Sequence, residues 1–158
     1  MRLLIIRHAR AAAAAHGSND EARPLTDEGR HEFQLLAREI AEREAIPEFI
    51  IHSPARRTTE TASILATEVG VNADANISAP WLGLDTHWDR IAPRLAELAA
   101  DVTALVGHEP TMSALTAILT GTGRRSFSPG SSVCLEFDGS IEIGKGRLLW
   151  LLEPRGAV

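Results

Sequence analysis

Two histidines each follow a short apolar segment, and arginines lie near them in the chain. Arg7 and His8 come directly after the apolar residues 3–6, and His108 follows a second apolar segment at residues 102–106. A neutral imidazole is a competent nucleophile toward phosphorus, and a guanidinium donates paired hydrogen bonds to phosphate oxygens while staying charged. The pattern therefore indicates phosphoryl-transfer chemistry.

The segments that carry these residues read as buried strands alternating with helices. Residues 3–6 and 49–51 are short continuous apolar runs, and residues 102–106 are apolar except for Thr103; such runs are typical of strands covered on both faces. Thr26 is a suitable N-cap for a helix over residues 27–44, and Ser53 with Pro54 predicts a second helix ending at Gly70. Residues 71–85 look like a loop, and further helices are predicted over residues 87–100 and 110–121.

The last part of the chain has a different pattern. Residues 132–137 and 147–152 predict two strands with an irregular connection. Repeated alternation of strands and helices predicts an α/β fold, in which ligands bind beyond the carboxyl ends of the strands. His8, Ser53 and His108 all fall at such ends. Residues 9–24, here called the flap, contain five consecutive alanines and predict a mobile loop.

Composition restricts the class of protein. A chain of 158 residues that is 44% hydrophobic suffices for one core, so residues 1–158 are predicted to form one domain. The net charge of -5 argues against a nucleic-acid-binding surface. The apolar start is too short for a signal peptide, no segment is long enough to span a membrane, and the one cysteine, Cys134, cannot form an internal disulfide. We expect a cytoplasmic protein without membrane contact and with a buried thiol.

Four pieces of the chain together resemble the histidine phosphatase superfamily. They are LIIRHA at residues 4–9, RPLTDEG at 23–29, SPARRTTETA at 53–62 and VGHEPTMS at 106–113. Their order and the short length are similar to the small SixA-type phosphohistidine phosphatases. The resemblance implies a phosphoglycerate mutase-like three-layer sandwich, with a mostly parallel central sheet flanked by helices and the C-terminal strand pair at its edge.

The resemblance also implies roles for individual residues. His8 would be the nucleophile that becomes a phosphohistidine, and Arg7, Arg57 and His108 would bind the phosphoryl group. Arg57, rather than its neighbour Arg56, matches the family's arginine. The secondary candidates for substrate binding are Arg23 and the neutral donors Ser53 and Thr111, and neither a cofactor nor a metal ion is expected.

Physical chemistry agrees with these roles and raises two further points. Cationic neighbours are expected to depress the pKa of His8, which keeps its attacking nitrogen unprotonated. Glu109 would repel substrate if it pointed inward, so it is expected to face outward or to pair with an arginine. Asp85 is the nearest candidate for a general acid. Imidazole is a better leaving group than an alkoxide, which favours a phosphohistidine substrate over a poorly activated phosphate ester.

Three readings of function stay open at this point. The first is a metal-independent phosphatase for phosphohistidine in a protein, and the second is a phosphatase for a small phosphorylated substrate that uses Asp85. The third is a non-catalytic module that binds phosphate. A metal site formed by His8, His52 and His108 is disfavoured, because no carboxylate cluster or cysteine pair accompanies them.

Overall fold

Six strands form one sheet in the computed structural model, which describes residues 1–155. The order across the sheet is β3-β2-β4-β1-β5-β6. The first four of these pair in parallel, whereas β5 and β6 are antiparallel to their neighbours. Their bounds are β1 Arg2–Arg7, β2 Phe49–His52, β3 Asn76–Ser78, β4 Val102–Gly107, β5 Ser132–Glu136 and β6 Arg147–Leu152. The predicted mostly parallel sheet with a C-terminal strand pair at its edge is confirmed.

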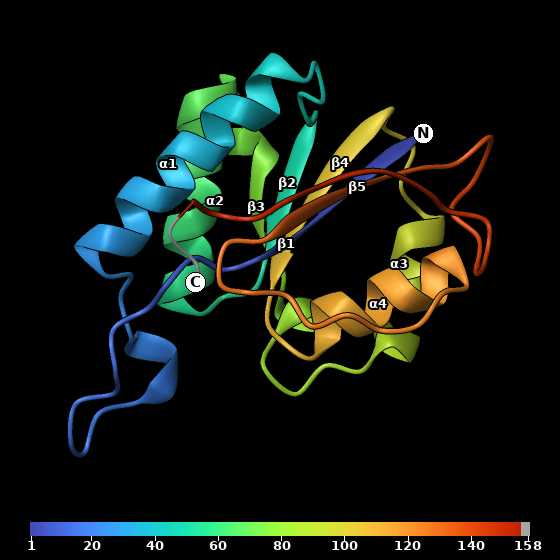
Figure 1. Cartoon of the computed structure of the whole chain (residues 1–158). Coiled ribbons are helices and arrows are strands. Elements are labelled where there is room, and N and C mark those ends of the chain that lie inside the picture. The colour runs from blue at the N-terminus through green and yellow to red at the C-terminus, as the bar shows by residue number, and fades with distance from the viewer. Residues whose placement is uncertain (156–158) are drawn as a thin grey trace.

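Helices cover both faces of the sheet and complete three layers (Figure 1). Helices α1 and α2 lie on one face, and α3 and α4 lie on the other. The four helices span α1 Asp27–Glu42, α2 Arg56–Val69, α3 Trp88–Ala96 and α4 Thr111–Thr120, and the short 3-10 turns are η1 Asp20–Ala22, η2 Ala73–Ala75 and η3 Pro80–Leu82. In the described part of the chain, no helix has the length and apolar character that crossing a membrane requires.

Strand β1 contributes apolar side chains to the core under each of the two helix layers. Leu4 and Ile6 point into the core beneath α1 and α2, while Leu3 and Ile5 point into the core beneath α3 and α4. All four side chains are fully buried, as expected for a central strand whose apolar residues are continuous rather than alternating. Cys134 of β5 is also buried, as its apolar neighbours predicted.

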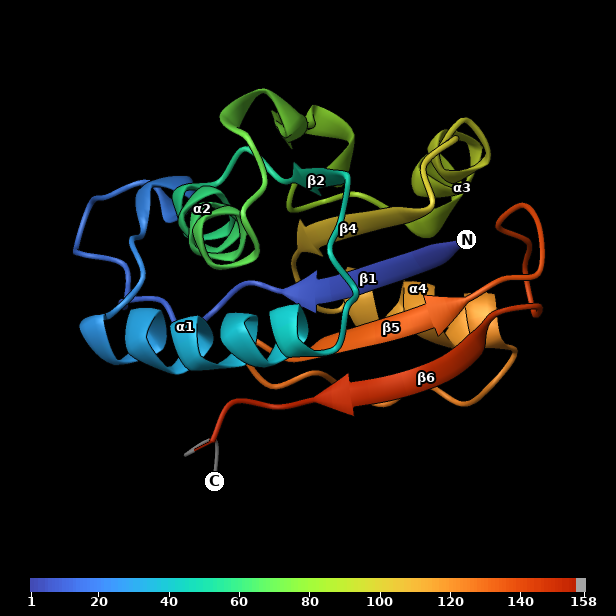
Figure 2. The ribbon, with the colours of Figure 1, turned by 90° about the horizontal axis from the view of Figure 1, so that it is seen from above.

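The register of the parallel strands brings the two histidines together. Arg7 pairs with Gly107 at the ends of β1 and β4, so the next residues, His8 and His108, leave the sheet side by side. Ser53 follows β2 on the other side of β4, and its amide donates to the Val106 carbonyl at 3.0 Å. Figure 2 shows β1, β2 and β4 pointing toward the same edge, where the flap also lies.

The chain diverges at this edge, which favours a binding site there. After β1 it passes through α1 to β2 and β3 on one side of the sheet. After β4 it passes through α4, which covers the opposite face of the sheet, to β5 on the other side of β1. The crevice beyond the carboxyl ends of two strands that diverge in this way is the usual ligand position in such sheets.

The structure corrects three local predictions. Helix α2 begins at Arg56 instead of following a Ser53 cap, because the Ser53 amide extends the sheet register and its hydroxyl contacts His108. The 71–85 segment is not only loop, because β3 adds to the sheet beside β2. Backbone pairing with β2 forms this strand, and its residues, Asn76–Ser78, have no apolar pattern that predicts one. Helix α3 ends at Ala96, four residues before the predicted end.

Candidate active site

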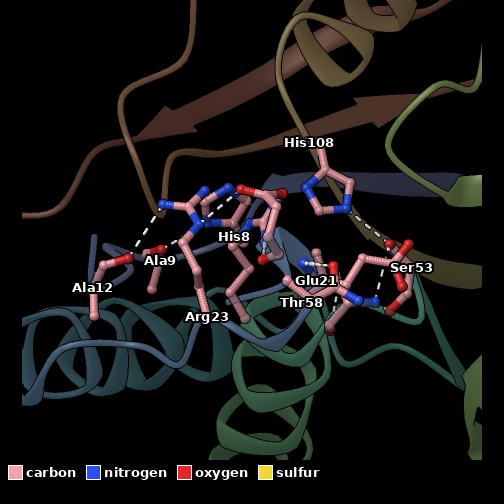
Figure 3. A network of polar contacts seen from close by, with 12 residues as sticks. His8, Ala9, Ala12, Glu21, Arg23, Ser53, Thr58 and His108 are labelled. Atoms are coloured by element: carbon pink, nitrogen blue, oxygen red, sulfur yellow. Dashed lines mark hydrogen bonds and ion pairs between the residues drawn. The ribbon is translucent and has the colours of Figure 1, made fainter. Parts of the chain in front are cut away.

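Four residues predicted from the sequence meet at this edge of the sheet. Arg7 ends β1 and His8 follows it, Arg57 lies in the first turn of α2, and His108 follows β4. The rings of His8 and His108 lie 5.4 Å apart between centroids. Figure 3 shows the two histidines with Arg23, which reaches the cluster from the flap. The arrangement places two imidazoles among cationic side chains.

A hydrogen bond fixes which nitrogen of His8 is available. Nδ1 lies 2.7 Å from the Ala9 carbonyl, an acceptor, so Nδ1 carries the proton and Nε2 keeps its lone pair. The Ala9 amide donates to the Thr61 hydroxyl at 3.0 Å, and that hydroxyl donates to the Arg57 carbonyl at 2.7 Å. The loop after His8 is therefore tied to α2.

Gly130, two residues before β5, also holds the loop after His8. Gly130 donates its amide to the His8 carbonyl at 2.9 Å. Its φ of +84° lies in the left-handed region, and a Cβ there would come within 2.9 Å of Pro154. Only glycine satisfies both conditions without strain.

His8 is poised as a neutral base or nucleophile. Burial lowers its pKa to about 4, and the charges of Arg57, Arg7 and Arg23 act in the same direction against its hydrogen bond to Ala9. Near neutral pH the imidazole is therefore unprotonated, as the arginine-rich surroundings predicted. An unprotonated Nε2 in a cationic pocket can attack an anionic phosphorus centre.

His108 is held by Ser53 and is also neutral without a bound anion. Its Nε2 lies 2.8 Å from the Ser53 hydroxyl oxygen. Burial, together with the charges of His8 and Arg57, lowers the pKa of His108 to about 3. Its Nδ1 is buried without a hydrogen-bond partner among the described residues. Ser53, predicted as a phosphate donor, thus contacts His108 in this structure.

The structure distinguishes the two adjacent arginines. The side chain of Arg57 is only 2% exposed, whereas that of Arg56 is 57% exposed. Arg56 pairs with Glu60 through an Nε–Oε1 distance of 3.0 Å, one turn along α2. Arg57 points into the cluster and Arg56 points to solvent, although both stand in the first helical turn.

One carboxylate at this site, that of Asp20, was not predicted from the sequence. Arg57 Nη1 donates to the Asp20 carbonyl at 2.9 Å, and Nη2 donates to Asp20 Oδ2 at 3.0 Å. Arg23 Nε lies 2.9 Å from Asp20 Oδ1. Although burial opposes it, contact with Arg57 and then Arg23 holds the pKa of the Asp20 carboxyl below its usual value. The one available signal was its position three residues before Arg23.

Arg7 is anchored by a segment that the sequence left unassigned. Its Nη1 donates to the Phe127 carbonyl at 2.6 Å, and the Phe127 amide donates to Glu109 Oε2 at 3.1 Å. Glu109 also accepts from the amide of Ser113 at 2.9 Å and from its hydroxyl at 2.8 Å. The expectation that Glu109 faces outward or pairs with an arginine is wrong: three hydrogen bonds to Ser113 and Phe127 satisfy its carboxylate.

The remaining candidates lie around the cluster. Arg23 donates from Nη1 to the Ala12 carbonyl at 3.2 Å, which joins the two ends of the flap. Thr111 donates its hydroxyl to the Thr86 carbonyl at 3.0 Å. Asp85 is exposed, and no hydrogen bond or ion pair within residues 1–155 links it to the histidines or arginines of the cluster. Residues 1–155 also contain no group of three His, Cys, Asp or Glu side chains that could hold a metal ion.

Comparison with known proteins gives one family match and several structural matches. A family model described as the histidine phosphatase superfamily (branch 1) matches residues 3–78. No curated protein sequence matches the chain. A protein named SixA from Agrobacterium tumefaciens is 25% identical, with a TM-score of 0.83 and 97% of each chain covered.

Two further solved structures share the fold. The protein histidine phosphatase SixA in complex with tungstate is 23% identical, with a TM-score of 0.86, and the match covers 98% of this chain and 97% of that one. A mycobacterial glucosyl-3-phosphoglycerate phosphatase in complex with VO3 is 20% identical, with a TM-score of 0.72, and the match covers 97% of this chain and 99% of that one. The predicted phosphoglycerate mutase-like fold is confirmed.

Proposed function

We propose that the chain, which is similar to the histidine phosphatase superfamily and to SixA structures, removes the phosphoryl group from phosphohistidine in a protein. The family match over residues 3–78 and the SixA-like fold support phosphatase activity in general. The observation that carries the proposal is the state of His8, whose Nδ1 is bonded to Ala9 and whose Nε2 is unprotonated near neutral pH.

The reaction that fits this geometry has two steps. In the first, the His8 Nε2 lone pair forms a bond to phosphorus, and the bond from phosphorus to the substrate imidazole breaks. The leaving imidazole takes up a proton from water. In the second step a water oxygen attacks phosphorus, the bond to Nε2 breaks, and inorganic phosphate leaves. Arg7 and Arg57 hold the phosphoryl oxygens in both steps. A bound phosphoryl group would raise the pKa of His108 and favour its protonated, donating form.

The nature of the leaving group supports phosphohistidine over a phosphate ester. An alkoxide needs a proton from a general acid as the bond breaks, whereas imidazole is readily protonated near neutral pH. Within residues 1–155 Asp85 forms no hydrogen bond or ion pair with the cluster, and Asp20 is held in its ionised form by two arginines. Neither carboxylate is placed as a proton donor, and the proposal needs none.

The direct test is single-turnover hydrolysis of a phosphohistidine-bearing protein and of an aryl phosphate, both with EDTA present. We expect faster cleavage of the phosphohistidine, and a phosphoenzyme that is labile in acid and stable in alkali. His8→Ala should remove both turnover and the phosphoenzyme. The matched control is His31→Ala, because His31 is exposed on α1 and outside the cluster.

Each alternative has its own signature in this experiment. Loss of turnover in EDTA would contradict a metal-independent reaction, and a preference for the aryl phosphate that is lost in Asp85→Asn would identify a small-molecule phosphatase. Phosphate binding without turnover of any phosphoramidate would leave only a binding module. A phosphoenzyme that persists in His8→Ala would exclude His8 as the nucleophile.

A further inference from the structure

The buried guanidinium of the site is already occupied by an anion from the flap. Arg57 has two terminal nitrogens, and both donate to Asp20, one to its carbonyl and one to its carboxylate. Its Nε is buried and has no hydrogen-bond partner among the described residues. A phosphoryl group that is to be held by the terminal nitrogens of Arg57 must therefore take the place of Asp20.

The carboxylate of Asp20 is bound much as a phosphoryl group would be. Its Oδ2 accepts from Arg57 and its Oδ1 lies 2.9 Å from Arg23 Nε, so each oxygen faces a different guanidinium. Planar arginine donors that fit carboxylate oxygens fit phosphate oxygens equally well. Asp20 and a phosphoryl group are thus alternative ligands of the same donors.

The local structure keeps Asp20 at this position without burying it. Asn19 caps the turn η1, and its side-chain oxygen accepts from the Glu21 amide at 3.0 Å. Every residue of η1 is exposed, and the Asp20 side chain itself is 51% exposed. A large partner that touches the flap can therefore shift Asp20, whereas a free phosphate ion has no flap contact with which to do so.

We propose that Asp20 is a specificity-determining residue: it excludes free phosphate-sized anions from the site, and a phosphorylated protein displaces it from Arg57 and Arg23. The inference rests on the proposed function for its substrate class. The tethered carboxylate competes with every anion for Arg57 and Arg23, and only a substrate with additional contacts to the flap gains enough binding free energy to displace it. The reaction product, inorganic phosphate, is accordingly bound weakly.

The test measures binding of inorganic phosphate to the full chain by isothermal titration calorimetry, which needs no turnover. Removing one charge-assisted contact should make phosphate bind about tenfold more tightly to Asp20→Asn than to the wild type. Asp20→Ala should show the same direction of change, which covers the case in which the asparagine amide still contacts Arg57. The matched control is Glu21→Gln, which removes the same charge one residue further on, where no ion pair is formed within residues 1–155.

A second measurement separates this role from a catalytic one. Single-turnover hydrolysis of the phosphohistidine protein should become more sensitive to inhibition by added phosphate in Asp20→Asn than in Glu21→Gln. Unchanged or weaker phosphate binding in both Asp20 variants would overturn the inference. So would a large loss of the single-turnover rate, because that would make Asp20 a catalytic residue. Tighter phosphate binding in a chain without any turnover would support the anion competition and contradict only the proposed function.

Discussion

Lowering the pH should destabilise the folded chain through His8 in a way that one substitution removes. In the folded state burial lowers the pKa of His8 to about 4, whereas an unfolded histidine titrates near 6.5. Between these values the unfolded chain binds a proton that the folded chain does not. The free energy of unfolding therefore falls as the pH falls through this window, by about 1.4 kcal/mol per pH unit.

The magnitude follows from the width of the window. Between pH 7 and pH 5 the His8 contribution amounts to about 2 kcal/mol, and at pH 5 only about one tenth of folded molecules carry the proton on His8. Urea unfolding at the two pH values gives the loss for the wild type and for His8→Asn. We expect the wild type to lose about 2 kcal/mol more than the variant.

The comparison between chains is needed because other groups titrate in the same direction. His108 also has a lowered pKa and contributes a similar slope, but it is present in both chains. The exposed His31 provides the matched control, because His31→Asn makes the same substitution outside the cluster. Equal losses in the wild type and His8→Asn would refute the reasoning, because they would mean that His8 is protonated as easily in the folded state as in the unfolded one.

Three substitutions test the contacts that build the site. Gly29→Ala should destabilise by about 2 kcal/mol despite the better helix propensity of alanine, because the new Cβ would lie 2.3 Å from the Arg10 carbonyl oxygen; Gly139→Ala, in open space, should be nearly neutral in urea unfolding. Thr61→Val should lower the free energy of unfolding by about 1–3 kcal/mol, because the buried Ala9 amide loses its acceptor. Thermal unfolding of Thr67→Val, which changes an exposed threonine of the same helix, gives the baseline. Arg57→Lys should slow single-turnover hydrolysis by at least about a hundredfold, since an ammonium cannot make the paired hydrogen bonds of a guanidinium. Arg56→Lys should retain the wild-type rate. Equal rates in the two variants would contradict the assignment of Arg57.

The sequence by itself determined the parts of the protein that depend on local pattern. Mostly apolar segments made the buried strands β1 and β4 recognisable, and the end of each segment marked where His8 and His108 leave the sheet. Thr26 was correctly predicted as the cap of α1, where its hydroxyl accepts from the Gly29 amide at 2.9 Å. These features follow from residues within one or two turns of one another, so the chain order alone specifies them.

Only the tertiary structure decided which polar groups the site residues contact. Arg56 and Arg57 are neighbours in the same turn, and packing of α2 against the sheet buries one and exposes the other. Asp20 meets Arg57 across 37 positions of sequence, and Arg7 meets Phe127 across 120. Hydrogen bonds of this kind depend on where the sheet register and the loops bring distant segments, and no local periodicity records them. The charge state of His8 follows from the same cause, since burial by those segments lowers its pKa.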